Sequence, residues 1–383
     1  MHKQLIDTST SDIKIYSKKQ IINADNDIDA IKIWLYQFYD TPSTFANYRK
    51  EAERFLLWCF SRNKTLKTIM FDDILLFKEF CQDPKPYDIW VSVKRYPRAN
   101  MHWKPFSSSN GLGKNSLKLT ETTLSVLFSW LCNAGYLNNN PFKLKRRQAR
   151  KDLTVQRYLN EDLLNAILDY LNQNLKSAIT PKQISQAIRC KWIISLFYLT
   201  GIRISEAICN NMSNFIKEFS KDNEEEWWLK IIGKGQKMRK IPIHPELIDI
   251  LKLYRAKNLK INELPNIKEQ LPLVCKKQNS KIQGVTRASL HNWIKKIFED
   301  SKEFILNNDS YKDLQDKAYL LDKASAHWIR HTTWTHMANK NIDLRYIRDN
   351  AGHSSISTTN IYLHSEDKKR HKASVKLSLK GNH

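Results

Sequence analysis

Four short segments in the second half of this 383-residue chain carry side chains suited to phosphate chemistry. The segments read TGIRISEA, GKGQKMRKIPI, HWIRHT and AGHSSISTTNIYLH. Their chemically competent side chains are Arg203, Glu206, Lys234, His327, Arg330, His353 and Tyr362. Each one alone has an ordinary structural explanation, because most tyrosines pack in cores and many arginines begin or brace helices. Their occurrence together, in this order, is what indicates a shared site.

Two guanidiniums and a phenol have the chemistry to open a phosphodiester. Attack on such an ester passes through a five-coordinate state that gathers negative charge on its oxygens. Arg203 and Arg330 can neutralise that charge in bidentate geometry, since a guanidinium keeps its proton. One lost donor of this kind typically costs roughly 3–4 kcal/mol of transition-state stabilisation. Tyr362 supplies a hydroxyl that can attack and remain bonded to the broken strand, and nearby cations would favour its phenolate.

The remaining side chains have supporting roles. Lys234 lies at the tip of a predicted hairpin and can protonate the departing deoxyribose oxygen. His327 precedes an arginine by three residues, so both project from one helix face, and a histidine, such as those at 327 and 353 in these segments, has the chemistry to accept the phenol proton. Glu206 follows an arginine by three residues and can hold that guanidinium in place. The sequence therefore predicts phosphoryl transfer through a phosphotyrosine, with no metal and no cofactor.

The overall charge agrees with a polyanionic partner. The chain has 63 Lys and Arg against 39 Asp and Glu, a net charge of +24, which favours nucleic acid over the alternatives, anionic lipid or a generally basic soluble protein. Only nine glycines argue against glycine-rich nucleotide-binding loops. The six cysteines form no C-x-x-C pair, so neither a zinc site nor a disulfide framework is indicated. With no signal peptide or membrane-spanning run apparent, we expect a cytoplasmic, nucleoid-associated protein without a membrane partner.

The first part of the chain predicts helices that could present DNA-binding residues. Apolar spacing predicts helices over residues 43–60, 71–82 and 120–137. The intervening loop predicts a short β-ribbon over 89–96. Basic residues alternate there with aromatics and could grip a sugar-phosphate backbone, as could the basic run near residue 145; a solvated surface is the alternative for both. The predicted DNA-binding residues are Lys94, Arg95, Arg98, Lys145, Arg146, Arg147 and Arg150.

The second part predicts helices around one β-hairpin. The hairpin pairs 227–232 with 238–243 across a turn at Gly233 and Gly235. Helices are expected over 160–171, 191–200, 247–259 and 288–300, and around HWIRHT. The fold class is therefore mainly α with a small antiparallel β-sheet (α+β). We expect a polar lead-in over 1–25, a helical DNA-binding domain over 26–145, a basic linker over 146–157 and a catalytic domain with a C-terminal tail over 158–383.

The order Arg, Lys, His-x-x-Arg, His, Tyr resembles the tyrosine recombinase (phage integrase) family. The four segments quoted above look like that family's catalytic motifs, and the likeness covers roughly residues 155–365. The likeness implies that the catalytic residues are Arg203, Lys234, His327, Arg330, His353 and Tyr362, and that Glu206 supports them. Residues 43–59 and 120–142 look like the family's helical core-binding domain. Departures are Ala351, where leucine is usual, and longer insertions at 84–115 and before His327.

The resemblance implies a clamp around duplex DNA, cleavage of one strand to a 3′-phosphotyrosine and a free 5′-hydroxyl, and resealing by a partner strand. It also implies a homotetramer on two synapsed sites, possible accessory DNA-bending proteins, and no need for ATP. We predict a site-specific recombinase, an integrase or transposase of a mobile element. The alternatives are a DNA-relaxing enzyme like the type IB topoisomerases and a DNA-binding protein without catalysis. The tail after Tyr362 is either a strand that docks on a neighbouring protomer or a disordered basic extension.

Overall fold

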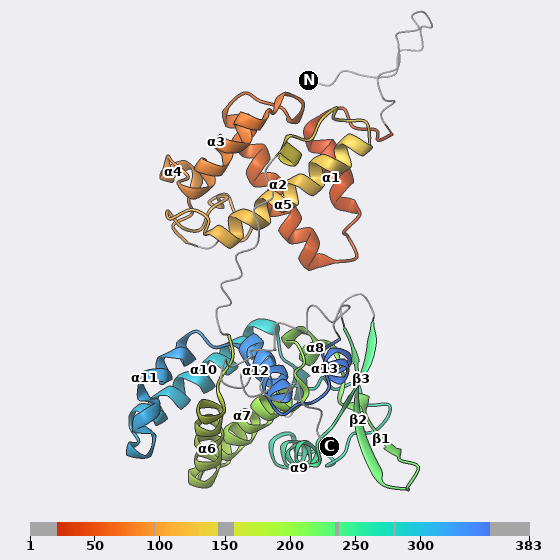
Figure 1. Ribbon diagram of the computed structural model, residues 1–383, viewed down its shortest axis with the longest axis vertical. Helices are drawn as coiled ribbons and strands as arrows, with labels where there is room; N and C mark the ends of the chain where they lie inside the picture. Colours follow the sequence, from red (N-terminus) through yellow and green to blue (C-terminus); the bar gives the residue numbers. More distant parts are fainter. Residues whose placement is uncertain (1–20, 95, 145–156, 234–236, 279–280, 353–383) are drawn as a thin grey trace, which may run out of the picture. The chain divides into compact units, whose positions relative to one another are not determined.

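The chain divides into two compact units, Met1–Asp152 and Leu153–His383, each with its own core. The computed structural model describes residues 21–94, 96–144, 157–233, 237–278 and 281–352 (Figure 1). Helices predominate and the strands form two small antiparallel sheets, which confirms the predicted fold class. No helix within these ranges has the length and apolarity to cross a bilayer.

The N-terminal unit is helical and is built around aromatic side chains. Its longer helices are α1 (Asp27–Tyr36), α2 (Pro42–Ser61), α3 (Phe71–Gln82) and α5 (Lys114–Asn133). Short helical turns are η1 (Leu66–Thr68), α4 (Tyr87–Trp90) and η2 (Pro141–Leu144). Phe55 lies at the centre of the core and contacts the rings of Trp58, Phe77, Phe128 and Phe142. The apolar faces of α2, α3 and α5 therefore meet in one cluster, as their helical spacing predicts.

The β-ribbon predicted over 89–96 is wrong. Residues 87–90 form the helical turn α4 instead, and Val91 forms only an isolated bridge with Phe106. The backbone of Ser92 donates to the carbonyl of Phe106, whose own N–H donates to the carbonyl of Trp90. Trp90 and Phe106 are both buried, so the hydrogen bonds between residues 90–92 and Phe106 hold two aromatic side chains against the core.

The C-terminal unit packs its helices beside a three-stranded sheet. That sheet has the order β1 (Phe215–Phe219), β2 (Glu225–Ile232), β3 (Met238–Pro242), all antiparallel. The pairing of β2 with β3 confirms the predicted hairpin, whereas β1 and the hairpin of β4 (Cys275–Gln278) with β5 (Lys281–Gly284) were not predicted. Figure 1 shows α8 and α13 beside β3.

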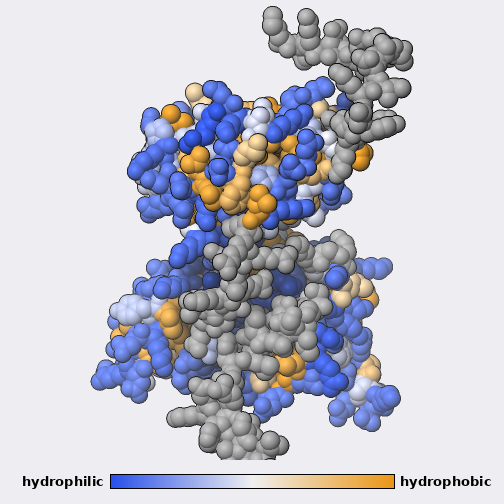
Figure 2. All heavy atoms as spheres, turned by 45° about the horizontal axis from the view of Figure 1, so that its top comes forward, coloured by the Kyte–Doolittle hydropathy of each residue, from blue (hydrophilic) through white to orange (hydrophobic). Residues whose placement is uncertain are grey.

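The helices of this unit complete the scaffold that holds the predicted site. They are α6 (Glu161–Ser177), α7 (Pro181–Thr200), α8 (Ile204–Cys209), α9 (Pro245–Leu253), α10 (Arg287–Leu306), α11 (Gln315–Ala318), α12 (Ala326–Asn339) and α13 (Leu344–Ala351). Shorter helical turns are η3 (Met212–Asn214), η5 (Tyr254–Leu259), η6 (Asp309–Leu314) and η7 (Tyr319–Asp322). Helix α7 runs through the core against α6, α9, α10 and α12. Figure 2 shows a mostly hydrophilic described surface, consistent with apolar side chains being gathered in the two cores.

The end of α7 shows why a glycine precedes the first predicted arginine. Thr180 caps the start of α7 in a capping box with Gln183, and Pro181 occupies the first turn. At the other end Gly201 adopts φ +58°, a left-handed conformation that glycine adopts without strain. A Cβ atom there would lie 2.3 Å from Cζ2 of Trp334 on α12. The turn that leads into Arg203 is therefore packed directly against α12.

Candidate active site

Arg203 occupies the N-cap position of α8 and is held there by Glu206. Its backbone N–H donates to Oε2 of Glu206 at 2.8 Å, and its Nη1 donates to Oε1 at 3.0 Å. The carboxylate therefore fixes both the start of the helix and the guanidinium. The Arg203 side chain is 39% exposed, so the guanidinium remains accessible to a phosphate.

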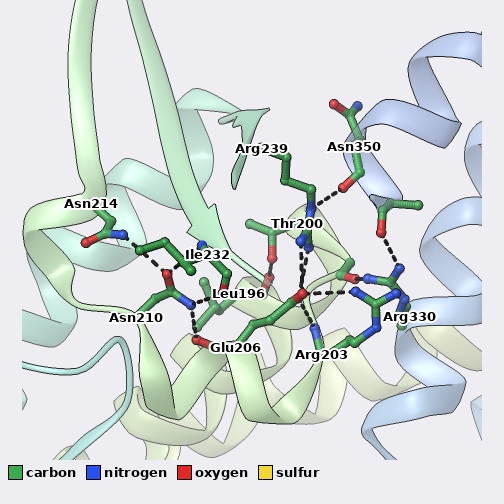
Figure 3. A network of polar contacts seen from close by, with 12 residues as sticks. Leu196, Thr200, Arg203, Glu206, Asn210, Asn214, Ile232, Arg239, Arg330 and Asn350 are labelled. Atoms are coloured by element: carbon green, nitrogen blue, oxygen red, sulfur yellow. Dashed lines mark hydrogen bonds and ion pairs between the residues drawn. The ribbon is translucent and has the colours of Figure 1, made fainter. Parts of the chain in front are cut away.

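Glu206 is a buried carboxylate shared by two arginines (Figure 3). Besides Arg203 it accepts two hydrogen bonds from Arg239 of β3, at 2.9 Å from Nη1 and 2.8 Å from Nη2. Burial opposes ionisation of Glu206, but the hydrogen bonds and charge of Arg239, with help from Arg203, outweigh it and lower the pKa of the carboxyl to about 2. Glu206 is therefore ionised at neutral pH and balances part of the positive charge of the site.

Arg330 projects from α12 into the interior and binds two backbone carbonyls. Its Nη1 donates to the carbonyl of Gly201, and its Nη2 donates to the carbonyl of Ala351 at 2.6 Å. The residue is 3% exposed, and its guanidinium lies over the ring of Trp334. These contacts join α12 to the turn before Arg203 and to the end of α13.

The C-terminus of α13 is held by two arginines from distant parts of the chain. The last carbonyls of a helix have no partner within it. Here Asn350 O accepts from Nε of Arg239 at 2.8 Å, and Ala351 O accepts from Arg330. Gly352 then closes the helix at φ +63°. The helix end is thus fixed directly before His353.

Asn210 ties α8 to the end of β2. Its side-chain amide donates to the carbonyl of Ile232 at 3.2 Å and accepts from the Ile232 N–H at 2.9 Å. Gly233, which follows Ile232, donates its N–H to the carbonyl of Lys237 at 2.9 Å. This hydrogen bond closes the base of the turn between β2 and β3. Ile232 and Gly233, which lead into this turn, are therefore both held by hydrogen bonds.

His327 lies on α12, one turn before Arg330. Burial, followed by the charges of Arg330, Arg157 and Arg203, lowers the pKa of the His327 imidazole below its ordinary 6.5. Its Nε2 lies 2.8 Å from Nε2 of His331, with the rings edge to face. One of the two Nε2 atoms must therefore carry a proton and the other must accept it.

The structure thus brings together four of the predicted residues, Arg203 and Glu206 at the start of α8 and His327 and Arg330 near the start of α12. The other three predicted site residues, Lys234, His353 and Tyr362, lie outside the described residues.

Two residues of the site, Arg239 and His331, were not predicted. Arg239 shares a strand face with Ile241, which is buried, so an inward-facing arginine needs a buried carboxylate. The signal was present in the alternation of β3, in which Arg239 stands two residues before the apolar Ile241. His331 follows His327 by four residues, one helical turn, and this spacing alone predicts contact between the rings.

The predicted DNA-binding residues of the N-terminal unit are only partly described. Lys94 is exposed. Arg98 stacks on Trp103 at 4.2 Å and donates twice to Glu53, at 2.8 and 3.1 Å. Its charge is therefore already balanced within the unit. The remaining members of the set lie outside the described residues: Arg95, Lys145, Arg146, Arg147 and Arg150.

Comparisons with known proteins agree with this geometry. The profile of the "Phage integrase family" matches residues 157–369, more than half of the chain. Among curated proteins, the chain is 27% identical over 260 residues to the tyrosine recombinase XerC of Thermodesulfovibrio yellowstonii, covering 66% of this chain and 72% of that protein. It is 25% identical over 324 residues to a tyrosine recombinase of Agathobacter rectalis, covering 83% and 92%.

Solved structures show the same fold. The XerH site-specific recombinase, bound to palindromic difH substrate in a post-cleavage complex, matches with a TM-score of 0.59 at 19% identity, covering 92% of this chain and 84% of that one. The Tn1549 transposon integrase, in complex with transposon right end DNA, matches with a TM-score of 0.55 at 16% identity, covering 91% and 99%. The chain accordingly belongs to the phage integrase family, that of the tyrosine recombinases, which are enzymes that break and rejoin DNA strands.

Proposed function

We propose that this protein exchanges strands between two specific DNA sites, with Tyr362 as the nucleophile. The observation that carries the proposal is the joining of Arg203 and Arg330 through one turn. Arg330 donates to the carbonyl of Gly201, two residues before Arg203, while Arg203 keeps an accessible guanidinium. Two permanent cations supported in this way suit the charge that develops on an attacked phosphodiester.

The proposed reaction has two balanced transfers. The phenol oxygen of Tyr362 bonds to phosphorus while the bond from phosphorus to the 5′ oxygen breaks. The phenol proton passes to a histidine, for which His327 is suited because its lowered pKa leaves it neutral. Lys234 gives a proton to the departing 5′ oxygen, and His353 and the two arginines bind the phosphate oxygens. A 5′-hydroxyl of the partner strand then reverses these steps, so the bond energy is conserved in the phosphotyrosine.

The proposal also covers the oligomeric state of the protein, its accessory proteins and its biological role. We propose a homotetramer on two synapsed duplexes, assisted by DNA-bending proteins, acting in the cytoplasm on nucleoid DNA. We also propose that the protein serves a mobile element as its integrase or transposase. The fold likeness to the transposon integrase is compatible with that role, whereas the curated relatives named above are Xer-type or unspecified tyrosine recombinases.

Covalent capture tests the nucleophile. Wild-type protein is incubated with sheared duplex DNA, the mixture is denatured in detergent, and DNA attached to protein is recovered and sequenced. A nicked duplex built on the recovered sequence then traps the adduct, because the short cleaved strand diffuses away. Tyr362→Phe should retain DNA affinity and form no adduct. Tyr346→Phe, an exposed tyrosine on α13, is the matched control and should form the adduct like wild type. Adducts formed by Tyr362→Phe would exclude the proposed nucleophile.

A plasmid with two copies of the captured site separates recombination from simple relaxation. Recombination deletes or inverts the segment between the sites. An enzyme that only relaxes supercoils returns the parental restriction pattern, and a binder without catalysis leaves the supercoiling unchanged. Relaxation without exchanged segments would replace this proposal by the topoisomerase-like alternative.

A further inference from the structure

Arg239 makes three hydrogen bonds within the site, and the proposed mechanism gives it no role. Its side chain is 9% exposed. Its Nη1 and Nη2 both donate to the Glu206 carboxylate, while its Nε donates to the carbonyl of Asn350. One guanidinium from β3 thus connects α8 and the end of α13 (Figure 3).

The same guanidinium packs against two glycines that directly precede proposed catalytic residues. A Cβ atom on Gly233 would lie 3.3 Å from Arg239 Nη1 and 3.2 Å from Glu206 Oε1. A Cβ atom on Gly352 would lie 3.0 Å from Arg239 Cδ and 3.3 Å from its Nη1. Lys234 follows the first glycine and His353 follows the second. Both backbones therefore approach Arg239 more closely than a side chain on either residue would comfortably allow.

We propose that Arg239 is a positioning residue that fixes three catalytic groups relative to one another. It holds Arg203 through their shared carboxylate, Glu206. It contacts the backbone beside Lys234 and binds the helix end beside His353. This inference rests on the proposed function, because it takes the catalytic roles of those residues from it.

The role needs arginine rather than any cation. The planar guanidinium presents N–H groups in fixed directions, two toward the carboxylate and one toward the Asn350 carbonyl. A lysine ammonium is a point charge on a flexible stem and does not reproduce three donors in one plane. Arg239→Lys therefore keeps the charge beside Glu206 but loses the geometry.

The test compares single-turnover cleavage with DNA affinity on the trapped nicked duplex. Arg239→Lys should lower the cleavage rate about 100-fold, the effect typical of a misplaced electrostatic donor, while DNA affinity changes by less than about 3-fold. Gly233→Ala adds a methyl group 3.3 Å from Nη1 of Arg239, which moves the Gly233 backbone away from the Arg239–Glu206 pair without removing a buried charge, and should lower the rate about 10-fold. Lys240→Gln is the control: Lys240 neighbours Arg239 on β3, is exposed and pairs with Glu218, and its variant should cleave like wild type.

A second substrate identifies which group is displaced. Replacing the bridging 5′ oxygen by sulfur gives a leaving group that departs as a thiolate and needs no proton. Cleavage of this substrate should be largely restored in Gly233→Ala, which disturbs the residue beside Lys234. Arg239→Lys should recover only in part, because Arg203 and His353 stay displaced. A merely structural defect would not respond to the sulfur.

The outcomes separate this inference from the proposed function. If Tyr362→Phe abolishes the adduct but Arg239→Lys and Gly233→Ala cleave at the wild-type rate, the positioning role is overturned and the nucleophile stands. If affinity falls as much as the rate, Arg239 acts in DNA binding and the inference is likewise overturned. If Arg239→Lys does not fold, as judged by its thermal melt, Gly233→Ala with the two substrates decides the question.

Discussion

Glu206 shows how a single buried carboxylate sets the charge balance of the site. It lies between Arg203 and Arg239, and its pKa is lowered to about 2 from an ordinary 4.5. A folded-state pKa below the unfolded value stabilises the fold above pH 4.5, and this stabilisation is lost as the pH falls toward 2. The shift corresponds to about 3 kcal/mol at neutral pH.

We therefore predict that Glu206→Gln lowers the free energy of unfolding by about 3 kcal/mol at pH 7, since Arg239 is left buried without its anion. The difference between variant and wild type should shrink as the pH is lowered from 4.5. Urea denaturation at a series of pH values measures both effects. Glu218→Gln, which removes an exposed ion pair with Lys240 on the same sheet, should change stability little. Equal losses in the two variants would contradict the assignment.

His327 offers a second prediction for a single residue. Burial and the charges of Arg330, Arg157 and Arg203 lower its pKa, so we expect a neutral imidazole at pH 7 that gains a proton only below pH 6.5. Because the folded state resists protonation, His327 reduces stability as the pH falls through 6.5. Titration of the histidine ring signals by NMR, assigned with His327→Gln, checks this. A titration midpoint at or above 6.5 would show that the ring lies in a different environment.

At the scale of elements, the turn between α7 and α8 packs against α12 two residues before Arg203. Gly201 combines φ +58° with contact against Trp334, so Gly201→Ala should destabilise the protein by about 3 kcal/mol through strain and overpacking. Gly113→Ala is the matched control. Gly113 is the N-cap of α5, has φ −65°, and a methyl group added to it would meet no atom within 4 Å, so its variant should lose less than about 1 kcal/mol. Thermal unfolding compares the two, and equal stabilities would refute the steric argument.

Helices and strands were predicted where the periodic spacing of apolar residues extends over many positions. Helices α2, α3 and α5 and the β2–β3 hairpin follow from helical spacing or alternation, although α5 begins at Lys114 rather than near Thr120. Strand β1 was missed because five residues give too short an alternation, and its partner is known only once β2 is paired. For the site, motif order predicts which residues come together, and the structure places Arg203, Glu206, His327 and Arg330 near one another. Arg239 could not be predicted in this way, because its contacts depend on which face of β3 meets α8 and α13.

At the scale of the whole molecule, the net charge of +24 predicts DNA binding that weakens steeply with salt. Log affinity should fall linearly with log salt, by about 0.9 for each phosphate neutralised. If the basic run after residue 144 contacts the backbone, replacing its four predicted residues by serine should reduce the slope by about 3 to 4. The four are Lys145, Arg146, Arg147 and Arg150. Fluorescence anisotropy over a range of salt concentrations measures the slope.

The control for this experiment removes the same number of charges elsewhere. It replaces four exposed lysines, each of which already lies within 4 Å of a carboxylate: Lys32, Lys85, Lys296 and Lys312. These changes should alter the slope much less. If both quadruple variants shift the slope equally, only total charge matters and the basic run has no special contact with DNA.

Arg239 and Arg330 bind the two carbonyls at the end of α13, close to the C-terminus of the chain. The order of synthesis therefore affects when an enzyme that cuts DNA becomes active. Both arginines are synthesised before the helix whose end they bind. A polypeptide still emerging from the ribosome therefore carries these cations but lacks the helix end that locks them in place. We expect such an unfinished copy to adhere to DNA through its charge without cutting it, because neither the end of α13 nor Tyr362, the proposed nucleophile, has yet been made.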